Sequence, residues 1–573
     1  MKRRSNRVSR YLVALGMGAV ATAAGYHAAT PAASPPDQPV RPEGCAASAF
    51  AAPNLSIASA RRVRTAAGKE YCRVEGDVTT SGGHAPPGRA AFMLNLPDDW
   101  TGKLLFQGGG GFDGFLPPLD ERQLGRGYAI IGTDSGHVGS PEALLPPFDT
   151  SWAVDADGKP AEAALADYFY RARSAVNAAV RPLIARYYGK AIDRAYFAGC
   201  SGGGREALIE AERHPEDYDG FIAGNPSTDP LRGVSAVATV NLLLRSPIPL
   251  ERLPEIDAEV TRQCDAADGV ADGLVQNPAA CNFDVDTLVA RRILSADQAR
   301  TLQSYLSVQR DGEGRFLAYG EPLGGLGYRG NVYPGAPSMM GLRVSASDMP
   351  PRTASGQPWG SLMKGPLGWI VGYGSVANMT FRRPDMDVLG SEVLTRKGLV
   401  TAKARRLSIE RWTAGVVAPD NMAKFFAKDR KLLIYHGYSD HVLNPYATIR
   451  TYRRMHRSAG GTQAAMRNAR LFMVPDMQHC MGGAGPNSFD PMPVLEDWVE
   501  RGIAPQQIIA TKYADDDPMK PVRRTMPVCP YPAMARYIGA GDVDKAENWR
   551  CDANDRRALK VGSSGRAAGL SDE

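Results

Sequence analysis

Residues 195–212 read AYFAGCSGGGREALIEAE, an apolar strand followed by a glycine-rich turn and the start of a helix predicted over roughly 203–213. Gly199, Ser201 and Gly203 form the pattern G-x-S-x-G directly between the two elements. Glycines on both sides permit a tight turn that lifts the serine hydroxyl clear of the sheet, and the helix start brings backbone N–H groups beside it. In this strand–turn–helix context the pattern predicts that Ser201 is a nucleophile.

Strands and helices alternate on both sides of this motif. In chain order, the other predicted elements are strands at 90–97, 103–107 and 128–134, a helix at 160–188, strands at 221–224 and 432–437, a helix at 445–458 and a strand at 471–475. Alternation of this kind is typical of a parallel sheet with crossover helices. The sequence therefore predicts an α/β fold.

The alternating pattern is interrupted by a long segment of different composition. Residues 227–425 are rich in Gly, Pro, Arg and scattered aromatic residues, and contain only short helical stretches. Because the strands on both sides can complete a single sheet, we predict that this segment is a large inserted lid domain. The core of the fold would then consist of residues 30–226 and 426–573.

The N-terminus has the pattern of an export signal. Residues 2–10 are basic, and residues 11–26 are apolar and small. This apolar run is shorter than the roughly 20 residues that a membrane-spanning helix needs. We therefore predict a signal peptide over 1–29 and a secreted or periplasmic mature chain without stable membrane association. An uncleaved membrane anchor is the alternative.

The charge balance gives no indication of a nucleic-acid partner. The chain has 67 Lys and Arg against 61 Asp and Glu, a net charge of +6, and five of the basic residues fall in the first ten positions. Removing these five leaves a net charge of +1 for the rest of the chain. Because nucleic-acid-binding proteins show a basic face or stripe, we expect no nucleic-acid binding.

Two residues after late strands complete a catalytic triad with Ser201. Asp440 follows the strand at 432–437, and His479 follows the strand at 471–475, so the order Ser, Asp, His of the α/β-hydrolases is satisfied. A carboxylate in this position can orient the imidazole and stabilise its cation. The competing residues, for which loop contacts are the favoured interpretation, are Asp476, His137, His436 and His441.

A glycine run supplies donors for the oxyanion that forms when a serine attacks a carbonyl. Gly108–Gly111 follow the strand at 103–107, where α/β-hydrolases provide one backbone N–H. We expect the N–H of Gly202 to be one donor and the N–H of Gly110 or Gly111 to be the other. A flexible glycine turn is the alternative.

Two cysteines flank the predicted catalytic residues. Cys200 precedes Ser201 and Cys480 follows His479, so a hydrogen bond between serine and histidine would bring the cysteines within reach of a disulfide. The chain has 8 cysteines, an even number that is usually paired in exported proteins, and no CxxC or CxxH pair that would indicate zinc. We therefore expect a Cys200–Cys480 bridge.

The combination of GCSGG at 199–203, GGGG at 108–111, YSD at 438–440 and HC at 479–480 resembles the tannase/feruloyl esterase family, which includes bacterial hydrolases of mono(2-hydroxyethyl) terephthalate. The resemblance covers residues 45–555 and implies an α/β-hydrolase fold with a large inserted lid domain. It also implies a serine esterase that hydrolyses carboxylic esters of aromatic, phenolic acids, such as feruloyl or galloyl esters, through an acyl-enzyme and without an organic cofactor. The alternatives are a terephthalate monoester hydrolase and, less favoured, a serine peptidase or a non-catalytic secreted binding protein.

An acidic cluster between two cysteines is suited to a cation. Asp265, Asp268 and Asp272 bring three oxygen ligands into eight residues, and the glycines at 269 and 273 allow tight bends. Ca²⁺ takes roughly 6–8 oxygens, some from backbone carbonyls, although the spacing here is not that of an EF-hand. A run of Asp-Gly turns without metal is the alternative.

The family has a structural calcium site of this kind in its lid, inside a disulfide loop. The resemblance therefore implies a Ca²⁺ site whose ligands are Asp265, Asp268, Val270, Asp272 and Leu274, the Val and Leu through their carbonyls. It also implies the bridges Cys264–Cys281 and Cys529–Cys551, which leaves Cys45–Cys72 as the fourth pair.

The predicted lid also contains residues that could contact a small aromatic ester. Its aromatic residues, most of which we expect to be core, are Tyr319, Tyr328, Tyr333, Trp359, Trp369, Tyr373, Phe381 and Trp412. Arg352, Arg382 and Arg383 could meet the carboxylate of a terephthalate monoester, but a solvated surface role is favoured for each. Gly202 stands where some relatives carry a larger residue. A phenolic-acid ester is therefore the preferred substrate.

Overall fold

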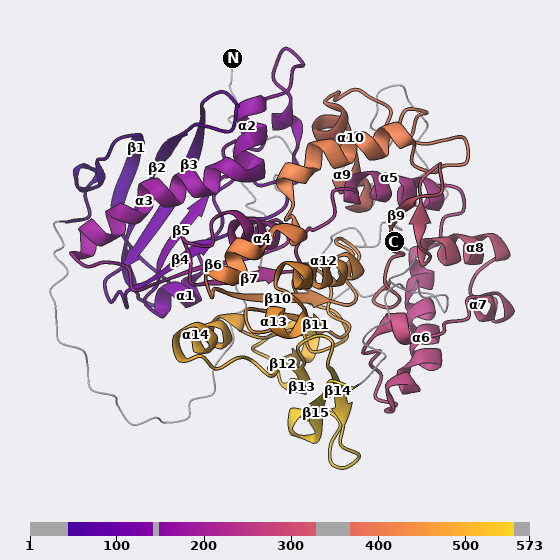
Figure 1. The fold of residues 1–573 in the computed structure, drawn as a ribbon. Coiled ribbons are helices and arrows are strands. Elements are labelled where there is room, and N and C mark those ends of the chain that lie inside the picture. The colour runs from indigo at the N-terminus through magenta and orange to yellow at the C-terminus, as the bar shows by residue number, and fades with distance from the viewer. Residues whose placement is uncertain (1–43, 141–147, 328–366, 555–573) are drawn as a thin grey trace, which may run out of the picture.

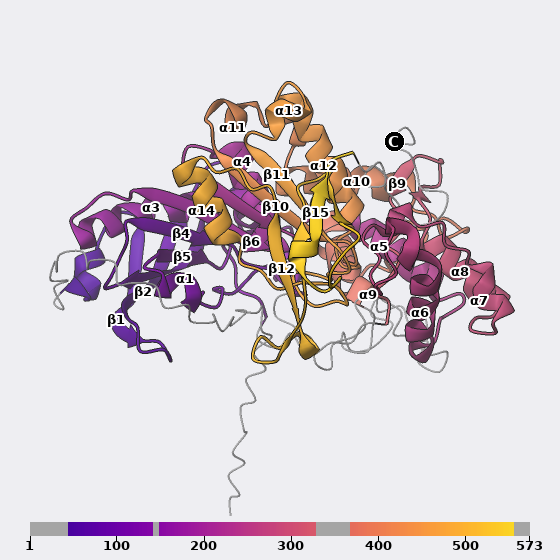
Figure 2. The ribbon, with the colours of Figure 1, turned by 90° about the horizontal axis from the view of Figure 1, so that it is seen from below.

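The computed structural model of the chain describes residues 44–140, 148–327 and 367–554. The predicted signal peptide over 1–29 lies outside the described residues. Within the described ranges, no helix is both long enough and apolar enough to cross a membrane. Figures 1 and 2 show a central sheet with helices on both faces and a largely helical part beside it.

A nine-stranded sheet forms the centre of the molecule (Figure 1). Its strands are β1 (Leu55–Arg64), β2 (Glu70–Thr80), β3 (Gly88–Pro97), β4 (Lys103–Gln107), β5 (Ala129–Thr133), β6 (Arg194–Cys200), β7 (Gly220–Gly224), β10 (Lys431–Gly437) and β11 (Ala469–Val474). Their order is β1-β2-β3-β5-β4-β6-β7-β10-β11. Strands β1 to β3 and β5 pair antiparallel, and the pairs from β5 through β11 are parallel. The predicted α/β fold is confirmed.

Helices cover both faces of the sheet because its central strands are apolar on both sides. Helices α3 (Ala172–Tyr188), α4 (Gly202–Arg213) and α12 (Pro445–Ser458) pack on one face, against side chains such as Phe197 and Leu432. Helices α1 (Glu121–Gly125) and α14 (Pro491–Arg501) pack on the other face, against side chains such as Tyr196 and Leu433. Consecutive residues of one strand thus enter opposite layers, as the two-residue period of a strand requires.

The carboxyl ends of the parallel strands meet at one edge of the sheet. Cys200 at the end of β6 is paired with Gly224 at the end of β7, and Gly437 at the end of β10 is paired with Val474 at the end of β11. The loops that follow these strands carry the serine, aspartate and histidine predicted from the sequence. A ligand site at this edge is the rule for open α/β sheets.

A long segment between β7 and β10 lies outside the sheet. Its elements are α5 (Arg232–Leu243), α6 (Leu253–Cys264), α7 (Asp286–Ala290), α8 (Ala296–Tyr305), β8 (Gln309–Arg310), β9 (Phe316–Ala318), α9 (Leu367–Gly374), α10 (Ala402–Trp412) and α11 (Ala423–Ala427). One apolar core lies among α6, α7 and α8, and a second among α5, α9 and α10. Figure 1 shows these helices gathered beside the sheet. That the segment acts as a lid stays a prediction.

Several elements differ from the sequence-based expectation. Strands β1 and β2 precede the first strand that the sequence indicated, because β1 is an edge strand whose residues are all at least partly exposed and whose arginines obscure the alternation. The C-terminal hairpins were not anticipated either: β12 (Ile508–Tyr513), β13 (Val522–Val528), β14 (Met534–Tyr537) and β15 (Trp549–Asp552). The helix expected over 160–188 begins as α2 (Glu162–Ala166) and continues through one widened turn into α3. A short helix, α13 (Thr462–Ala465), precedes β11.

Candidate active site

Ser201 occupies a sharp turn between β6 and α4. Its φ of 62° and ψ of −120° lie in a region that non-glycine residues rarely adopt, and its N–H donates to the Gly224 carbonyl over 2.9 Å. The strand and helix approach so closely that a Cβ on Gly199 would lie 2.6 Å from the carbonyl carbon of Gly203. The glycines of the motif therefore allow the strained turn that presents the serine hydroxyl.

The three residues of the predicted triad form one hydrogen-bonded chain. His479 Nε2 lies 2.8 Å from Ser201 Oγ, and His479 Nδ1 lies 2.8 Å from Asp440 Oδ2. Both distances lie within the normal range of hydrogen bonds. The loops after β6, β10 and β11 thus bring together three residues that are distant in the sequence.

Asp440 is completely buried and its carboxylate is fixed by several donors. Oδ1 accepts the N–H groups of Val442 and Leu443 over 2.8 and 3.0 Å, and Oδ2 accepts Asn225 Nδ2 over 2.8 Å. Burial alone would raise the pKa of Asp440, but the neighbouring imidazoles of His479 and His436 hold this pKa well below its usual range. The carboxylate is therefore ionised and oriented toward His479.

Asn225 and His436 are contacts of Asp440 that the sequence analysis did not anticipate. Asn225 directly follows β7 with a φ of 36°, and its side chain joins the β7 loop to the triad. His436 Nε2 lies 2.9 Å from the Leu443 carbonyl, as the loop-contact interpretation implied, and also 3.2 Å from Asp440 Oδ2. A polar residue directly after a buried parallel strand is the signal that could have indicated Asn225.

The other competing residues make structural contacts. His137 Nε2 lies 2.9 Å from the Phe112 carbonyl, and His441 Nε2 lies 2.9 Å from the Gly324 carbonyl. Burial lowers the pKa of each of these histidines to about 4. Asp476 accepts the Ser439 hydroxyl over 2.9 Å, and burial raises its pKa to about 6. Across the described ranges, none of these three residues contacts Ser201.

The glycine run Gly108–Gly111 lies directly against the start of α4. A Cβ on Gly202 would lie 2.8 Å from the Gly111 carbonyl oxygen, so a larger residue at this position would require the glycine run to move. A Cβ on Gly203 would lie 2.7 Å from the Gly109 oxygen. Among the residues that the structure describes, the N–H groups of Gly202 and Gly111 donate to no acceptor. Both are therefore open to a ligand oxygen.

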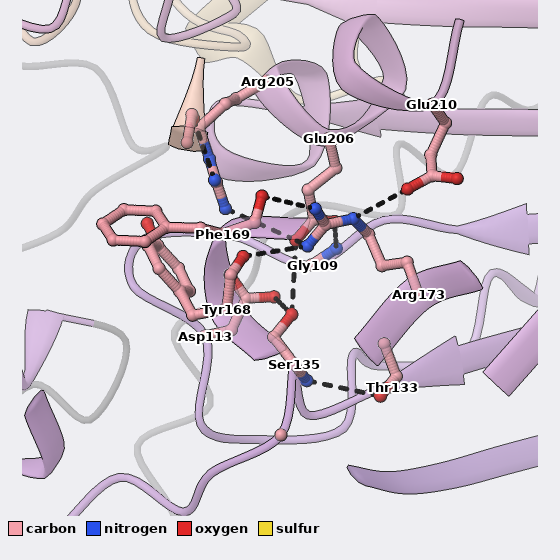
Figure 3. A network of polar contacts seen from close by, with 12 residues as sticks. Gly109, Asp113, Thr133, Ser135, Tyr168, Phe169, Arg173, Arg205, Glu206 and Glu210 are labelled. Atoms are coloured by element: carbon pink, nitrogen blue, oxygen red, sulfur yellow. Dashed lines mark hydrogen bonds and ion pairs between the residues drawn. The ribbon is translucent and has the colours of Figure 1, made fainter. Parts of the chain in front are cut away.

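A buried network of charges connects this glycine run to α4 (Figure 3). Glu206 Oε2 accepts the Gly109 N–H over 3.1 Å, and Glu206 Oε1 lies 3.3 Å from both Ser135 Oγ and Arg173 Nη1. Arg173 Nε also donates to Glu210 over 3.3 Å. The sequence did not indicate this network, because glutamates on a helix are usually solvated. The network links the helix that begins after Ser201 to the glycine run.

Asp113 lies at the edge of the same network. Its Oδ2 accepts the Ser135 hydroxyl over 2.8 Å. Burial, together with the nearby charge of Glu206, raises the pKa of Asp113 well above its usual range. Two buried arginines, Arg173 and Arg205, lie beside the buried glutamates Glu206 and Glu210.

All eight cysteines are paired as expected. The bridges are Cys45–Cys72, Cys200–Cys480, Cys264–Cys281 and Cys529–Cys551. Cys200–Cys480 joins residues that are 280 positions apart, with their Cα atoms 6.1 Å from one another. It thereby connects the residue before Ser201 to the residue after His479.

A cavity opens beside Ser201. Its aromatic lining consists of Phe112, Phe148, Tyr168 and Trp412. Of the aromatic residues that the sequence placed in the lid, Trp412 lines this cavity and Tyr319 lines an adjoining one. Trp369 and Tyr373 are packed in a core of the inserted segment, as expected for most of these residues, and Phe381 packs against that core. Tyr328, Tyr333 and Trp359 lie outside the described residues.

The arginines considered for a substrate carboxylate are engaged elsewhere. Arg382 donates to Glu162 over 2.5 Å, and the half-exposed Arg383 pairs with Glu392. Arg352 lies outside the described residues. The favoured surface interpretation therefore fits Arg382 and Arg383.

The predicted calcium loop is a compact turn whose carboxylates contact its own backbone. Asp265 Oδ1 accepts the N–H groups of Asp272 and Gly273 over 3.0 and 2.9 Å, and Asp268 Oδ1 accepts the Val270 N–H over 3.1 Å. Within the described ranges, no three His, Cys, Asp or Glu side chains converge as a ready metal-binding cluster.

The charges in this loop nevertheless suit a cation. Burial raises the pKa of Asp272, the charge of Asp265 adds to this effect, and Arg524 opposes it from 3.1 Å. Asp265, Asp268 and Asp272 bring carboxylate oxygens, which Ca²⁺ prefers as ligands, into one loop, where Arg524 already pairs with Asp272. That the loop binds Ca²⁺ stays a prediction.

The sequence and the fold both match known proteins. A family model described as tannase and feruloyl esterase matches residues 72–552. The mono(2-hydroxyethyl) terephthalate hydrolase of Piscinibacter sakaiensis is 30% identical over 547 residues, which cover 84% of this chain and 85% of that protein. A probable feruloyl esterase of Arthroderma benhamiae is 27% identical over 474 residues, 80% of this chain and 81% of that protein.

Two solved structures share the fold. Feruloyl esterase B from Aspergillus oryzae aligns with a TM-score of 0.70 at 20% identity, covering 89% of this chain and 99% of that chain. A tannin acyl hydrolase from Aspergillus niger aligns with a TM-score of 0.66 at 20% identity, covering 88% and 93%. Given the family match over most of its length, the chain belongs to the tannase and feruloyl esterase family of carboxylic ester hydrolases.

Proposed function

We propose that the protein is a secreted serine esterase that hydrolyses carboxylic esters of aromatic, phenolic acids, such as feruloyl or galloyl esters. The observation that carries the proposal is the hydrogen-bonded chain from Ser201 through His479 to Asp440 in the wall of an aromatic-lined cavity. Relatives named feruloyl esterase support the substrate class. The four disulfides are typical of proteins in oxidising compartments, which supports export.

The reaction would proceed through an acyl-enzyme. His479 Nε2 takes the proton of Ser201 while Oγ attacks the ester carbonyl carbon, and Asp440 stabilises the imidazolium that results. The tetrahedral intermediate then collapses, and the alcohol leaves with the proton from His479. A water molecule, deprotonated by the same histidine, attacks the acyl carbon and releases the acid.

Two backbone N–H groups would stabilise the oxyanion. We assign this role to Gly202 and to one of Gly110 and Gly111. Support comes from the close approach of Gly202 to Gly111 and from the absence of an acceptor for either N–H within the described residues. Donors held in place by the surrounding backbone stabilise developing charge without reorganisation.

Turnover of defined esters tests the proposal. Purified mature protein would be assayed with methyl ferulate, methyl gallate and mono(2-hydroxyethyl) terephthalate, next to Ser201→Ala. Turnover of a phenolic ester that is lost in the variant is the expected result. Ester hydrolysis that persists in Ser201→Ala would overturn the assignment of the nucleophile, and no turnover of any ester would overturn the substrate class.

A terephthalate monoester is the second substrate considered. The observation that favours it is the 30% identity to a protein named mono(2-hydroxyethyl) terephthalate hydrolase. Against it, Arg382 and Arg383 are paired with glutamates instead of facing the cavity beside Ser201. A kcat/KM for the terephthalate monoester that exceeds the value for methyl ferulate would reverse this order of preference.

We also propose that Ca²⁺ stabilises the inserted segment, which would act as the lid over the cavity. Its ligands would be the carboxylates of Asp265, Asp268 and Asp272 and the carbonyls of Val270 and Leu274. The role would be structural, because the loop contains no candidate nucleophile. The expected result of adding Ca²⁺ to chelator-treated protein is a higher Tm, with Mg²⁺ as the control; equal effects of both ions would contradict a specific site.

A further inference from the structure

Asp229 lies on the loop that follows β7, beside the nucleophile. Strand β7 pairs with β6, and the Ser201 N–H donates to the carbonyl of Gly224 at the end of β7. Five residues later, Asp229 lines the same cavity as Ser201 and also a small adjoining pocket. The carboxylate is thus a wall of the space in which an ester attacked by Ser201 would lie.

The Asp229 carboxylate has one oxygen free for a ligand. Oδ1 accepts the Leu231 N–H over 2.9 Å. Throughout the described part of the chain no group donates a hydrogen bond to Oδ2. The residue is half-buried, and its carboxylate is not sealed from the cavity. Burial raises the pKa of Asp229, while the Leu231 N–H and the charges of nearby arginines oppose that shift.

Two arginines belong to the described lining, and Arg232 is the one committed to protein groups. Arg232 donates from Nε and Nη2 to the carbonyls of Val442 and His441, both over 2.8 Å, and pairs with Glu321. Arg205 donates to the Gly415 carbonyl over 3.1 Å and stacks on the Tyr168 ring at 4.3 Å, and its Nε and Nη2 are buried without a hydrogen-bond partner among the described residues. The guanidinium of Arg232 is thus held by protein groups, whereas Asp229 Oδ2 accepts no hydrogen bond from the described residues.

We propose that Asp229 is a specificity-determining residue that accepts a hydrogen bond from a hydroxyl group of the bound ester and disfavours an ester that carries a carboxylate at that place. This inference rests on the proposed function, because it assigns a substrate contact within the same cavity. The hydroxyl has two possible sources, the phenol of the acyl group and the hydroxyl of the alcohol. A site built to bind a hydroxyl discriminates strongly against an analogue that lacks it, since the buried acceptor is then left unpaired.

Matched ester pairs identify the source of the hydroxyl. Methyl ferulate and methyl 3,4-dimethoxycinnamate differ in the phenol, and 2-hydroxyethyl benzoate and propyl benzoate differ in the alcohol. In the parent enzyme we expect kcat/KM to favour the hydroxylated member of one pair by about 10-fold. Asp229→Ala should reduce that preference to about 2-fold or less, mainly through KM. A preference unchanged by Asp229→Ala in both pairs would overturn the proposal.

A shift of substrate preference, which misfolding does not produce, tests the charge of Asp229. Asp229→Asn should raise kcat/KM for mono(2-hydroxyethyl) terephthalate by about 10-fold relative to methyl ferulate, because the repulsion between two carboxylates is removed. Ser227→Ala, which alters the same wall without a change of charge, should move both substrates in the same direction. Parallel losses for both substrates in Asp229→Asn would refute the assignment. A parent enzyme that hydrolyses no ester would refute the proposed function instead.

Discussion

Replacing Glu206 by Gln should slow catalysis, whereas the same change at Glu210 should not. Both glutamates are buried on α4, and each contacts Arg173 over 3.3 Å. Glu206 alone also accepts the Gly109 N–H, over 3.1 Å. Comparing the two variants therefore separates two effects of the network, which are the positioning of the glycine run and the general stability of the fold (Figure 3).

The expected magnitudes follow from these contacts. Each variant removes one charge-assisted hydrogen bond from the buried Arg173, which should cost about 1.5–3 kcal/mol of unfolding free energy. In Glu206→Gln, the single amide oxygen cannot serve both Gly109 and Arg173. Complete loss of one oxyanion donor lowers kcat by about 100- to 1,000-fold, and a displaced glycine run should cause part of that loss. We expect kcat to fall by about 10-fold and KM to change by less than about threefold.

The assay measures kcat and KM for the best ester substrate and the free energy of unfolding in urea. Glu210→Gln should lose a similar amount of stability with kcat within about twofold of the parent. Equal losses of kcat in the two variants, or a loss confined to KM in Glu206→Gln, would refute the reasoning that Glu206 positions the glycine run.

Three further predictions concern the bridge, the cation and pH. Replacing Cys200 and Cys480 together by Ala should lower kcat and should also lower the free energy of unfolding by about 2–5 kcal/mol. Loss of the remote Cys529–Cys551 bridge should lower the free energy of unfolding alone. Equal kcat values in the two variants would contradict this. Chelation of Ca²⁺ should lower the Tm of the parent protein by several degrees. In Asp268→Asn, the Tm should be the same with and without the chelator. A Tm that still falls on chelation in this variant would exclude Asp268 as a ligand. Burial raises the pKa of Asp134 from 3.8 to about 7. Between about pH 4 and 7 the folded state therefore keeps a proton that the unfolded chain releases. The contribution of Asp134 to the free energy of unfolding should consequently fall as pH rises through this range. Asp134→Asn should flatten that dependence in urea titrations, and an unchanged slope would contradict the assignment.

The hydrogen-bonded chain of Ser201, His479 and Asp440 could be predicted because each of its residues follows a recognisable strand. Ser201 lies in a motif that needs a strand before it and a helix after it, and Asp440 and His479 follow apolar runs that match buried parallel strands. Parallel strands bring their carboxyl ends to one edge, so the order along the chain sufficed to bring the loops together. The adjacent cysteines followed from the same geometry.

The cavity could not be predicted in the same way. The aromatic residues of the core that line it, Phe112, Phe148 and Tyr168, belong to loops and a helix whose spacing resembles ordinary packing. Most aromatic residues of the inserted segment were expected to be core, and Trp369 and Tyr373 do fill a core there, but the sequence did not indicate which of them, such as Trp412, would line the cavity. Burial against partners distant in the sequence decides between a pocket and a core, and a single sequence does not encode that choice locally.

The buried charges were also beyond local patterns. Glu206 and Glu210 occur in a helix sequence that would suit a solvated face, and only the packing of α3 against the sheet brings Arg173 to them. Strand β1 was missed for the opposite reason, because an exposed edge strand shows no continuous apolar run. Tertiary contacts outweigh local propensity in both cases.

Labelling of the nucleophile tests the central claim most directly. The mature protein would be treated with a fluorophosphonate, digested and mapped by mass spectrometry, while residual ester hydrolysis is followed in the same samples. We predict one adduct, on Ser201, that rises in proportion to the loss of activity and is absent from Ser201→Ala. An adduct on another residue, or activity that survives complete labelling of Ser201, would contradict the assignment of the Ser201–His479–Asp440 chain as the catalytic machinery.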